Sequence, residues 1–206
     1  MADPTLTSRR GVLGLLAMAA STVLLPVRAL AKNGDPVLGT IEAIKTRRSV
    51  RTYTDEAVGD DVLREILACG MQAPSACNEQ PWQFVVLRDR DLLAKVDGIN
   101  PYAKFAKDAA FAILVCGDLR LDKCGGYWVQ DCSNAAMNML LAAHSLGLGA
   151  VWTGIYPLED RVNGFRKLVG APAEVTPMAL LIMGHPADRP RPEDRFRGDR
   201  VHRDRW

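Results

Sequence analysis

The chain has 206 residues, enough for one compact domain with its own hydrophobic core. Hydrophobic residues make up 48% of it and charged residues 24%, the ordinary composition of a globular protein. The formal net charge of +2 gives no case for nucleic acid as a partner.

The first segment, residues 1–31, has the parts of an export signal. It contains the pair Arg9-Arg10, then a mildly apolar run, then a small-x-small exit at Ala31. The paired arginines and the run diluted by glycine and alanine resemble a twin-arginine signal. An uncleaved membrane anchor is the alternative, although about 17 diluted apolar residues are marginal for a bilayer. We expect cleavage after Ala31 and export to the periplasm, with the twin-arginine export machinery as a partner.

After this segment, helical and strand patterns alternate along the chain. Residues 32–38 are expected to form a linker, and residues 39–206 the folded domain. Apolar residues at helical spacing predict helices over residues 39–47, 60–73, 89–96, 127–145 and 158–169. Short apolar runs predict strands at residues 83–89, 109–117, 149–155 and 178–184.

Two features indicate that parts of this chain make contacts beyond the single domain. The helix over residues 127–145 is apolar nearly all round, which in a small domain is typical of a helix that packs against another subunit. From residue 188 onward the chain holds seven arginines and no lysine, and is too polar to fold alone. We expect this tail to be disordered or to lie across another surface, with Phe196, Val201 and Trp206 as anchors.

A cluster of arginines follows the first predicted helix. Arg47, Arg48 and Arg51 surround Ser49 within five positions. Guanidinium groups offer planar forks of donors that match phosphate oxygens, and the serine hydroxyl adds another donor. The residues alone leave two interpretations open, an anion site and a solvated basic turn.

A polar loop precedes the strand at residues 83–89. Pro74, Ser75, Asn78 and Gln80 place amide and hydroxyl groups at the mouth of this strand. Such groups suit recognition of the edge of a flat heteroaromatic ring, and a turn with a strand cap is the alternative. Trp82 is expected to pack in the core or at an interface rather than to serve as a platform for a ligand.

The glycines near residue 150 do not form a dinucleotide-binding fingerprint. Gly147 and Gly149 follow a helix and precede a strand, the reverse of the order that this motif requires. Gly154, after Thr153, instead allows the backbone to approach a ligand closely.

The five cysteines have no metal-binding spacing, and no metal is expected. Cys116 lies in an apolar run and is expected in the core, and Cys77 is expected as a small packed side chain. Cys124 and Cys132 could pair in an oxidising compartment.

Together the motifs resemble the FMN-dependent nitroreductase family, specifically its short, single-domain members. The matching stretches are RRSVR (47–51), PSACNEQPW (74–82), TGIYP (153–157) and GHP (184–186), followed by RF (195–196) and the terminal Trp206. The resemblance covers about residues 39–206. It implies an α+β fold, with a mostly antiparallel sheet of four to five strands flanked by helices, in an intertwined homodimer with FMN at the interface.

The resemblance also implies roles for individual residues. Arg47, Ser49 and Arg51 would bind the FMN phosphate, with Arg48 nearby. Arg195, and with it Arg197, would reach this phosphate from the tail.

Other positions would contact the flavin ring. Asn78 would bind the pyrimidine edge, and Pro74 and Ser75 would come from the partner subunit or the same loop. A backbone N–H near Gly154 would face flavin N5. Gln80 and Thr153 belong to the same cofactor-binding set.

The implied chemistry is a ping-pong transfer of two electrons. NAD(P)H or another donor reduces the flavin, and a nitroaromatic, quinone or similar small molecule accepts the electrons. Residues 98–108 are the best candidate for a segment that caps the substrate. The alternatives are a flavin-binding electron carrier or sensor without turnover, a flavin-fragmenting or dehalogenating member of the family, and an anion-binding adaptor without a cofactor.

Overall fold

The computed structural model describes residues 38–206 of the chain. Its helices are α1 (Thr40–Thr46), α2 (Asp60–Met71), α3 (Arg90–Ile99), α4 (Trp128–Ser145) and α5 (Glu159–Val169). Three short 3₁₀ helices are η3 (Ala76–Asn78), η4 (Pro101–Asp108) and η5 (Gly198–Arg200). The strands are β1 (Trp82–Leu87), β2 (Phe111–Asp118), β3 (Gly149–Gly154) and β4 (Val175–Gly184). Each helix and strand predicted from residue 39 onward is therefore present.

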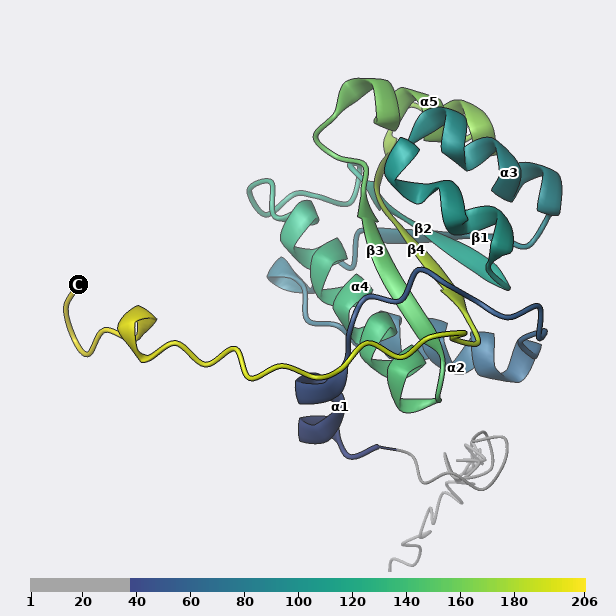
Figure 1. Ribbon diagram of the computed structural model, residues 1–206. Coiled ribbons are helices and arrows are strands. Elements are labelled where there is room, and N and C mark those ends of the chain that lie inside the picture. Colours follow the sequence, from purple (N-terminus) through teal and green to yellow (C-terminus); the bar gives the residue numbers. More distant parts are fainter. Residues whose placement is uncertain (1–37) are drawn as a thin grey trace, which may run out of the picture.

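The four strands form one antiparallel sheet in the order β1-β2-β4-β3, with helices on both faces (Figure 1). This confirms the expected α+β fold with a four-stranded antiparallel sheet. β3 is an edge strand, so one side of its backbone is not paired with a neighbouring strand of the sheet.

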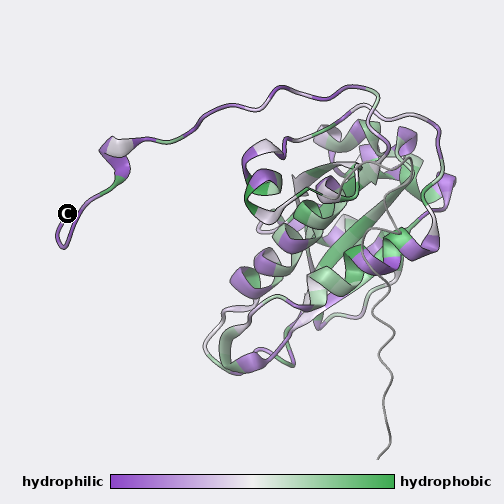
Figure 2. Cartoon of the chain, turned by 90° about the horizontal axis from the view of Figure 1, so that it is seen from below, coloured by the Kyte–Doolittle hydropathy of each residue, from purple (hydrophilic) through white to green (hydrophobic). Residues whose placement is uncertain are grey.

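The sheet divides the core into two layers. One layer lies between the sheet and the helices α2 and α4, and the other between the sheet and α3, η4 and α5. Side chains of β2 alternate between the layers, as Phe111 and Ile113 do on one face and Ala112 and Leu114 on the other. Because both faces are covered, the central strands are continuous apolar runs, visible as green ribbon within the fold in Figure 2.

The long helix α4 is largely buried within the single chain. It packs on α2 and on all four strands, and α1 lies against it. Its exposed positions, Gln130, Asn134 and Met137, follow one helical stripe. Large apolar side chains remain exposed on α1 as well, with Ile41 at 71% and Ile44 at 56% of their full exposure.

The C-terminal tail passes the end of α1 and then extends away from the rest of the molecule, as Figure 1 and Figure 2 show. All residues from 187 onward are exposed, and Phe196 (79%) and Trp206 (101%) bury little against their own chain. Trp82 and Cys116 lie in the core as expected. Across residues 38–206, no helix is long and apolar enough to span a membrane. The predicted signal (1–31) and nearly all of the linker (32–38) lie outside the described residues.

Candidate active site

The arginine segment is placed by α1 and by the edge of β3. α1 ends at Thr46, and the N–H of Arg47 donates to the carbonyl of Ala43 at 2.9 Å. The chain then runs beside β3, where the N–H of Val50 donates to the carbonyl of Ala150 at 3.1 Å. Gly149 makes this approach possible, because a Cβ there would lie 2.6 Å from a methyl of Val50.

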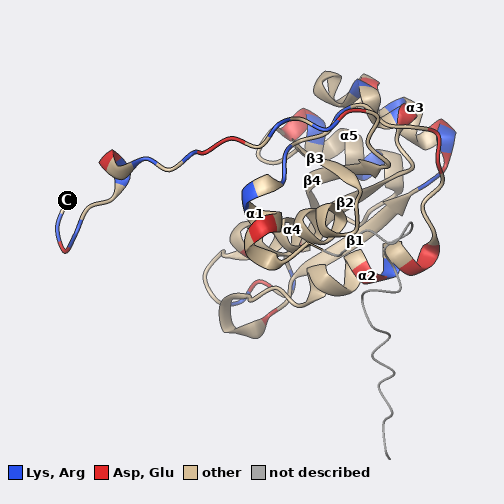
Figure 3. Cartoon of the chain, turned by 60° about the horizontal axis from the view of Figure 1, so that its bottom comes forward, with Lys and Arg blue, Asp and Glu red and all other residues tan. Residues whose placement is uncertain are grey.

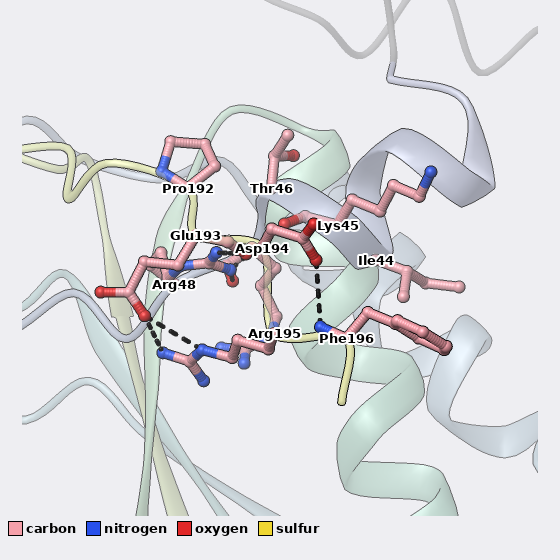
Figure 4. A pocket seen from close by; sticks show the side chains of 10 residues that line it. Ile44, Lys45, Thr46, Arg48, Pro192, Glu193, Asp194, Arg195 and Phe196 are labelled. Atoms are coloured by element: carbon pink, nitrogen blue, oxygen red, sulfur yellow. Dashed lines mark hydrogen bonds and ion pairs between the residues drawn. The ribbon is translucent and has the colours of Figure 1, made fainter. Parts of the chain in front are cut away.

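At one end of this segment, α1 and the tail enclose a hollow of about 550 Å³, which we call the arginine hollow. Its lining residues are Ile44, Lys45, Thr46, Arg47, Arg48, Pro192, Glu193, Asp194, Arg195 and Phe196. Figure 4 shows Arg48 and Arg195 within this group. Arg48 holds the two segments together, since its Nη1 donates to the carbonyl of Arg47 at 2.7 Å and its Nη2 to that of Glu193 at 2.8 Å.

The arginine hollow carries cations that repel one another. Burial lowers the pKa of Arg47, and the charges of Arg48 and Arg195 lower it further. Figure 3 shows basic positions on both α1 and the tail segment beside it. Arg195 pairs with Glu193 at 3.0 Å, and Arg48 Nε is buried without a hydrogen-bond partner among residues 38–206. An anion such as a phosphate would offset the repulsion and accept from the unsatisfied donor.

His144 links α4 to α1 immediately before the arginines. Its Nε2 lies 2.9 Å from Oγ1 of Thr46, whose hydroxyl donates to the carbonyl of Glu42 at 2.7 Å. Because this hydroxyl proton is already used, the imidazole Nε2–H is the donor to Thr46. Burial lowers the pKa of His144, and the charges of Arg189, Arg47 and Arg48 add to the effect.

At the other end of the arginine segment lies a hollow of about 710 Å³ beside β3, which we call the β3 hollow. Its lining residues are Arg51, Asn100, Pro101, Tyr102, Lys104, Phe105, Val151, Trp152, Thr153, Gly154 and Arg161. Thr153 is a structural part of its wall, because its buried hydroxyl donates to the carbonyl of Leu180 at 3.0 Å.

Gly154 turns its polar backbone groups away from the sheet. The next residue, Ile155, donates its N–H to Met178 across the sheet at 3.1 Å, so the alternation of a strand points Gly154 outward. The carbonyl of Gly154 accepts from Nδ2 of Asn100 at 3.3 Å and from Nη1 of Arg161 at 3.0 Å. A Cβ on Gly154 would meet nothing within 4 Å, so the space beside it is open.

The β3 hollow is basic and has an aromatic wall. Arg51, Lys104 and Arg161 line it, and its lining includes no carboxylate from the described part of the chain. Tyr102 is 74% exposed, and the guanidinium carbon of Arg161 lies 5.4 Å from the centre of its ring. The predicted capping segment supplies this wall, since Asn100 and Tyr102 lie at the start of η4.

The polar loop, residues 74–80, packs on the N-terminal half of α4. Its Ala76 N–H donates to Oδ1 of the buried Asp131 at 3.0 Å, and Asn134 donates to the carbonyl of Pro74 at 3.4 Å. Within the loop, Nε2 of Gln80 donates to Oδ1 of Asn78 at 2.9 Å.

The cysteine pairing differs from both expectations. Cys77 forms a disulfide with Cys124, so it is not merely a packed side chain, and Cys124 does not pair with Cys132. Cys132 is buried on α4, where its thiol donates to the carbonyl of Cys116 at 3.5 Å. Helix α4 directs Cys132 into the core, while the segment before α4 places Cys124 over the polar loop.

In the single chain, the predicted site residues therefore fall into three groups. Arg47, Arg48 and Arg195 meet in the arginine hollow, while Arg51 lies apart from them with Thr153 and Gly154 in the β3 hollow. The polar-loop group lines neither hollow; it consists of Pro74, Ser75, Asn78 and Gln80. Ser49 bridges to Ala150 between the two hollows, and Arg197 pairs with Asp199 in the tail at 2.8 Å.

The sequence predicted the capping segment at residues 98–108 but not the individual roles of Asn100 and Tyr102 within it, and it did not indicate Arg161. Asn100 and Arg161 hold the carbonyl of Gly154, and Tyr102 forms the exposed wall beside it. The Asn-Pro step at residues 100–101 is a helix-start signal that could have located η4. No sequence pattern pointed to Arg161, because the start of α5 and the end of β3 come together only in the folded chain.

Comparison with known proteins agrees with this geometry. The sequence model of the nitroreductase family matches residues 44–115 and 100–185. A Methanothermobacter thermautotrophicus protein provisionally named NADH dehydrogenase/NAD(P)H nitroreductase is 51% identical over 169 residues, covering 82% of this chain and 88% of its own.

Solved structures show the same likeness. A Bacteroides thetaiotaomicron protein with the same provisional name superposes with a TM-score of 0.78 at 40% identity, covering 81% of this chain and 98% of its own. A Desulfovibrio desulfuricans protein provisionally named nitroreductase, solved in complex with FMN, gives a TM-score of 0.69 at 36% identity over 82% and 98% of the two chains. This chain belongs to the nitroreductase family.

Proposed function

We propose that this protein is an FMN-dependent oxidoreductase that passes electrons from NAD(P)H to small-molecule acceptors such as nitroaromatics and quinones. Relatives named as FMN reductase and as NADPH nitroreductase support this proposal. The observation that carries it is the pair of hollows joined by residues 47–51. Four extended residues span roughly 13 Å, which suits an elongated ligand with a phosphate at one end and a ring at the other.

The residues present fit FMN at both ends. Arg47, Arg48 and Arg195 would hold the phosphate, where Arg48 Nε still lacks a partner, and Ser49 would add its hydroxyl. Once bound, FMN supplies reversible two-electron chemistry, and the protein supplies orientation and charge.

At the ring end, the protein contributes fixed donors. Gly154 would present its outward N–H to the flavin, and Asn100 and Arg161 keep this peptide in place through its carbonyl. Arg51 would stabilise negative charge that develops on the ring, because a fixed cation beside a developing charge requires no reorganisation. We therefore assign Arg51 to the ring end rather than to the phosphate.

The acceptor side of the site favours anionic aromatic molecules. Lys104 and Arg161 leave the β3 hollow with excess positive charge, and Tyr102 offers a ring for stacking. An aromatic acceptor that carries a carboxylate gains Coulomb attraction that its neutral amide analogue lacks.

A homodimer would bring the polar loop to the site. Pro74, Ser75, Asn78 and Gln80 line neither hollow of their own chain, so we assign them to the flavin of the partner subunit. The exposed tail and the apolar surface of α1 would be covered by a second copy of this chain, which supports the homodimer. Sedimentation equilibrium of the full chain and of a chain ending at residue 187 tests this assignment.

The spectrum of the purified protein tests the main proposal. We expect a yellow protein whose flavin absorbance is lost on anaerobic addition of NADH or NADPH and returns with a nitroaromatic or quinone. Steady-state oxidation of the pyridine nucleotide with such an acceptor would exclude a carrier or sensor without turnover. A colourless protein that acquires no colour from added FMN would contradict the proposal.

We also propose that residues 1–31 direct export to the periplasm by the twin-arginine route. The pair Arg9-Arg10 and the diluted apolar run support this proposal. Replacement of both arginines by lysine is expected to retain precursor in the cytoplasm. Normal export of this variant would refute the route.

A further inference from the structure

The polar loop holds an unusual backbone conformation. Cys77, Asn78 and Gln80 have φ values of 49°, 56° and 50°, and none of them is glycine. This left-handed region is unfavourable for residues with a Cβ, and only surrounding contacts keep side-chain-bearing residues there. The loop therefore depends on its restraints.

The internal restraints of the loop are few. The N–H of Asn78 donates to the carbonyl of Ser75 at 3.1 Å, and the N–H of Gln80 donates to Oγ of Ser75 at 3.0 Å. Ser75 accepts both bonds. The N–H of Glu79 also donates to the carbonyl of Ala76 at 3.0 Å, and Nε2 of Gln80 donates to Oδ1 of Asn78 at 2.9 Å, so these bonds restrain the loop as one turn. They do not fix it to the rest of the molecule.

The external restraints come from α4, through the hydrogen bonds of Asp131 with Ala76 and of Asn134 with Pro74, and from the segment before α4. The N–H of Lys123 donates to Oε1 of Glu79 at 2.8 Å, and the next residue, Cys124, forms the disulfide with Cys77. This hydrogen bond and the disulfide together form a clamp on the loop. The disulfide is its covalent part, and it is attached at Cys77, the residue directly before Asn78.

The disulfide lies at the surface of the molecule. Cys77 is exposed and Cys124 is half-buried, so a thiol in solution has access to the disulfide. Gly125 and Gly126 follow Cys124 with φ values of 107° and 84°, conformations that glycine adopts without strain. When the disulfide is broken, the hydrogen bond from Lys123 to Glu79 is the restraint that remains between this segment and the loop.

The remaining cysteines do not compete for this bond. Cys116 and Cys132 are buried, and burial raises the pKa of both thiols to about 12. Burial, with the charge of Glu65, also raises the pKa of Cys69. Thiol–disulfide exchange requires a thiolate, so these three thiols exchange poorly at neutral pH.

We propose that Cys77 and Cys124 form a thiol–disulfide site that locks the polar loop and slows release of the bound cofactor. A reduced dithiol transfers two electrons and two protons to the disulfide; the bond between the two cysteines breaks, two thiols form, and the dithiol becomes a disulfide. Exchange with an oxidised disulfide reverses the reaction. The loop is then free under reducing conditions and locked under oxidising ones.

This inference rests on the proposed FMN-dependent function. The test uses the full chain with bound FMN, in oxidised form and after treatment with dithiothreitol. Release is followed by the fluorescence of free FMN after dilution. We expect reduction to accelerate FMN release by roughly tenfold, which corresponds to relief of the backbone strain of one residue in the left-handed region.

Matched variants separate the clamp from general effects of the reductant. Cys124→Ser is expected to release FMN as fast as the reduced protein and to be insensitive to dithiothreitol, whereas Cys69→Ser should behave as the unmodified chain. Hydrogen exchange in the FMN-free protein gives a second readout, with faster exchange expected at residues 74–80 after reduction.

The outcomes distinguish the two proposals. A yellow protein with equal release rates in both states overturns the lock and leaves the oxidoreductase intact. So does a non-reducing peptide map without the Cys77–Cys124 cross-link. Global unfolding of both the reduced chain and Cys124→Ser also overturns the lock, since the bond would then only hold the fold. A protein that never binds FMN overturns both.

Discussion

Replacement of Cys124 by serine should measurably destabilise the fold. The disulfide joins residues separated by 47 positions, and closing a loop of this length in the unfolded chain is worth about 4 kcal/mol at 25 °C by the chain-entropy relation. Since native proteins are stable by roughly 5–15 kcal/mol, the variant should still fold. With a urea dependence of about 2 kcal/mol per molar, its unfolding midpoint should fall by roughly 2 M.

Urea unfolding of the FMN-free protein, followed by far-UV circular dichroism, measures this change. Protein concentration is held constant because the proposed homodimer would be stabilised by mass action. Dithiothreitol should lower the midpoint of the unmodified chain and leave that of the variant unchanged, with Cys69→Ser as the control. Equal midpoints for the variant and the oxidised chain would refute the assigned pairing.

Three further predictions concern the two hollows and His144. Arg47→Ala and Arg195→Ala should each weaken FMN binding about 10- to 100-fold, because a hydrogen bond to a charged group is worth roughly 1.5–3 kcal/mol. Fluorescence titration measures this affinity, and the control variant Arg200→Ala, on the outer tail, should bind FMN normally. Arg161→Gln should lower kcat/KM for nitrobenzoate roughly fivefold relative to nitrobenzamide, the scale of about 1 kcal/mol for a partly exposed charge, and an equal loss for both acceptors would contradict the charge preference. The lowered pKa of His144 adds stability that is present above about pH 6.5 and lost as the pH falls through the folded-state value. His144→Gln should therefore flatten the urea stability of the FMN-free protein over this range, and an unchanged pH profile would count against the lowered pKa.

The sequence predicted the helices and strands well because their patterns are local. The alternation of Phe111, Ala112 and Ile113 between two layers follows from a strand covered on both faces. The ends were less certain, and β4 begins at Val175, three residues before the predicted start. Thr176 and Pro177 ahead of the apolar run concealed this extension, because proline is rare within a strand.

The site was predicted only in part. The segment at residues 47–51 and Gly154 carry local signals, an arginine cluster and a glycine at the end of a strand, and both line hollows. The pairing of Cys77 with Cys124 was missed because the spacing of cysteines along the chain does not show which loops lie together in the fold. The separation of Arg51 from Arg47 also needed the structure, since an extended segment places its two ends in different surroundings.

The sequence by itself determined the order of helices and strands, the arginine cluster and the family resemblance, because periodicity and motifs are properties of neighbouring residues. Only the tertiary structure decided that the tail returns to the end of α1, that Asn100 and Arg161 meet at Gly154, and that Cys77 faces Cys124. These contacts join positions far apart in the chain. They exist only because the sheet and its two helical layers bury a common core and so fix where the loops between them lie.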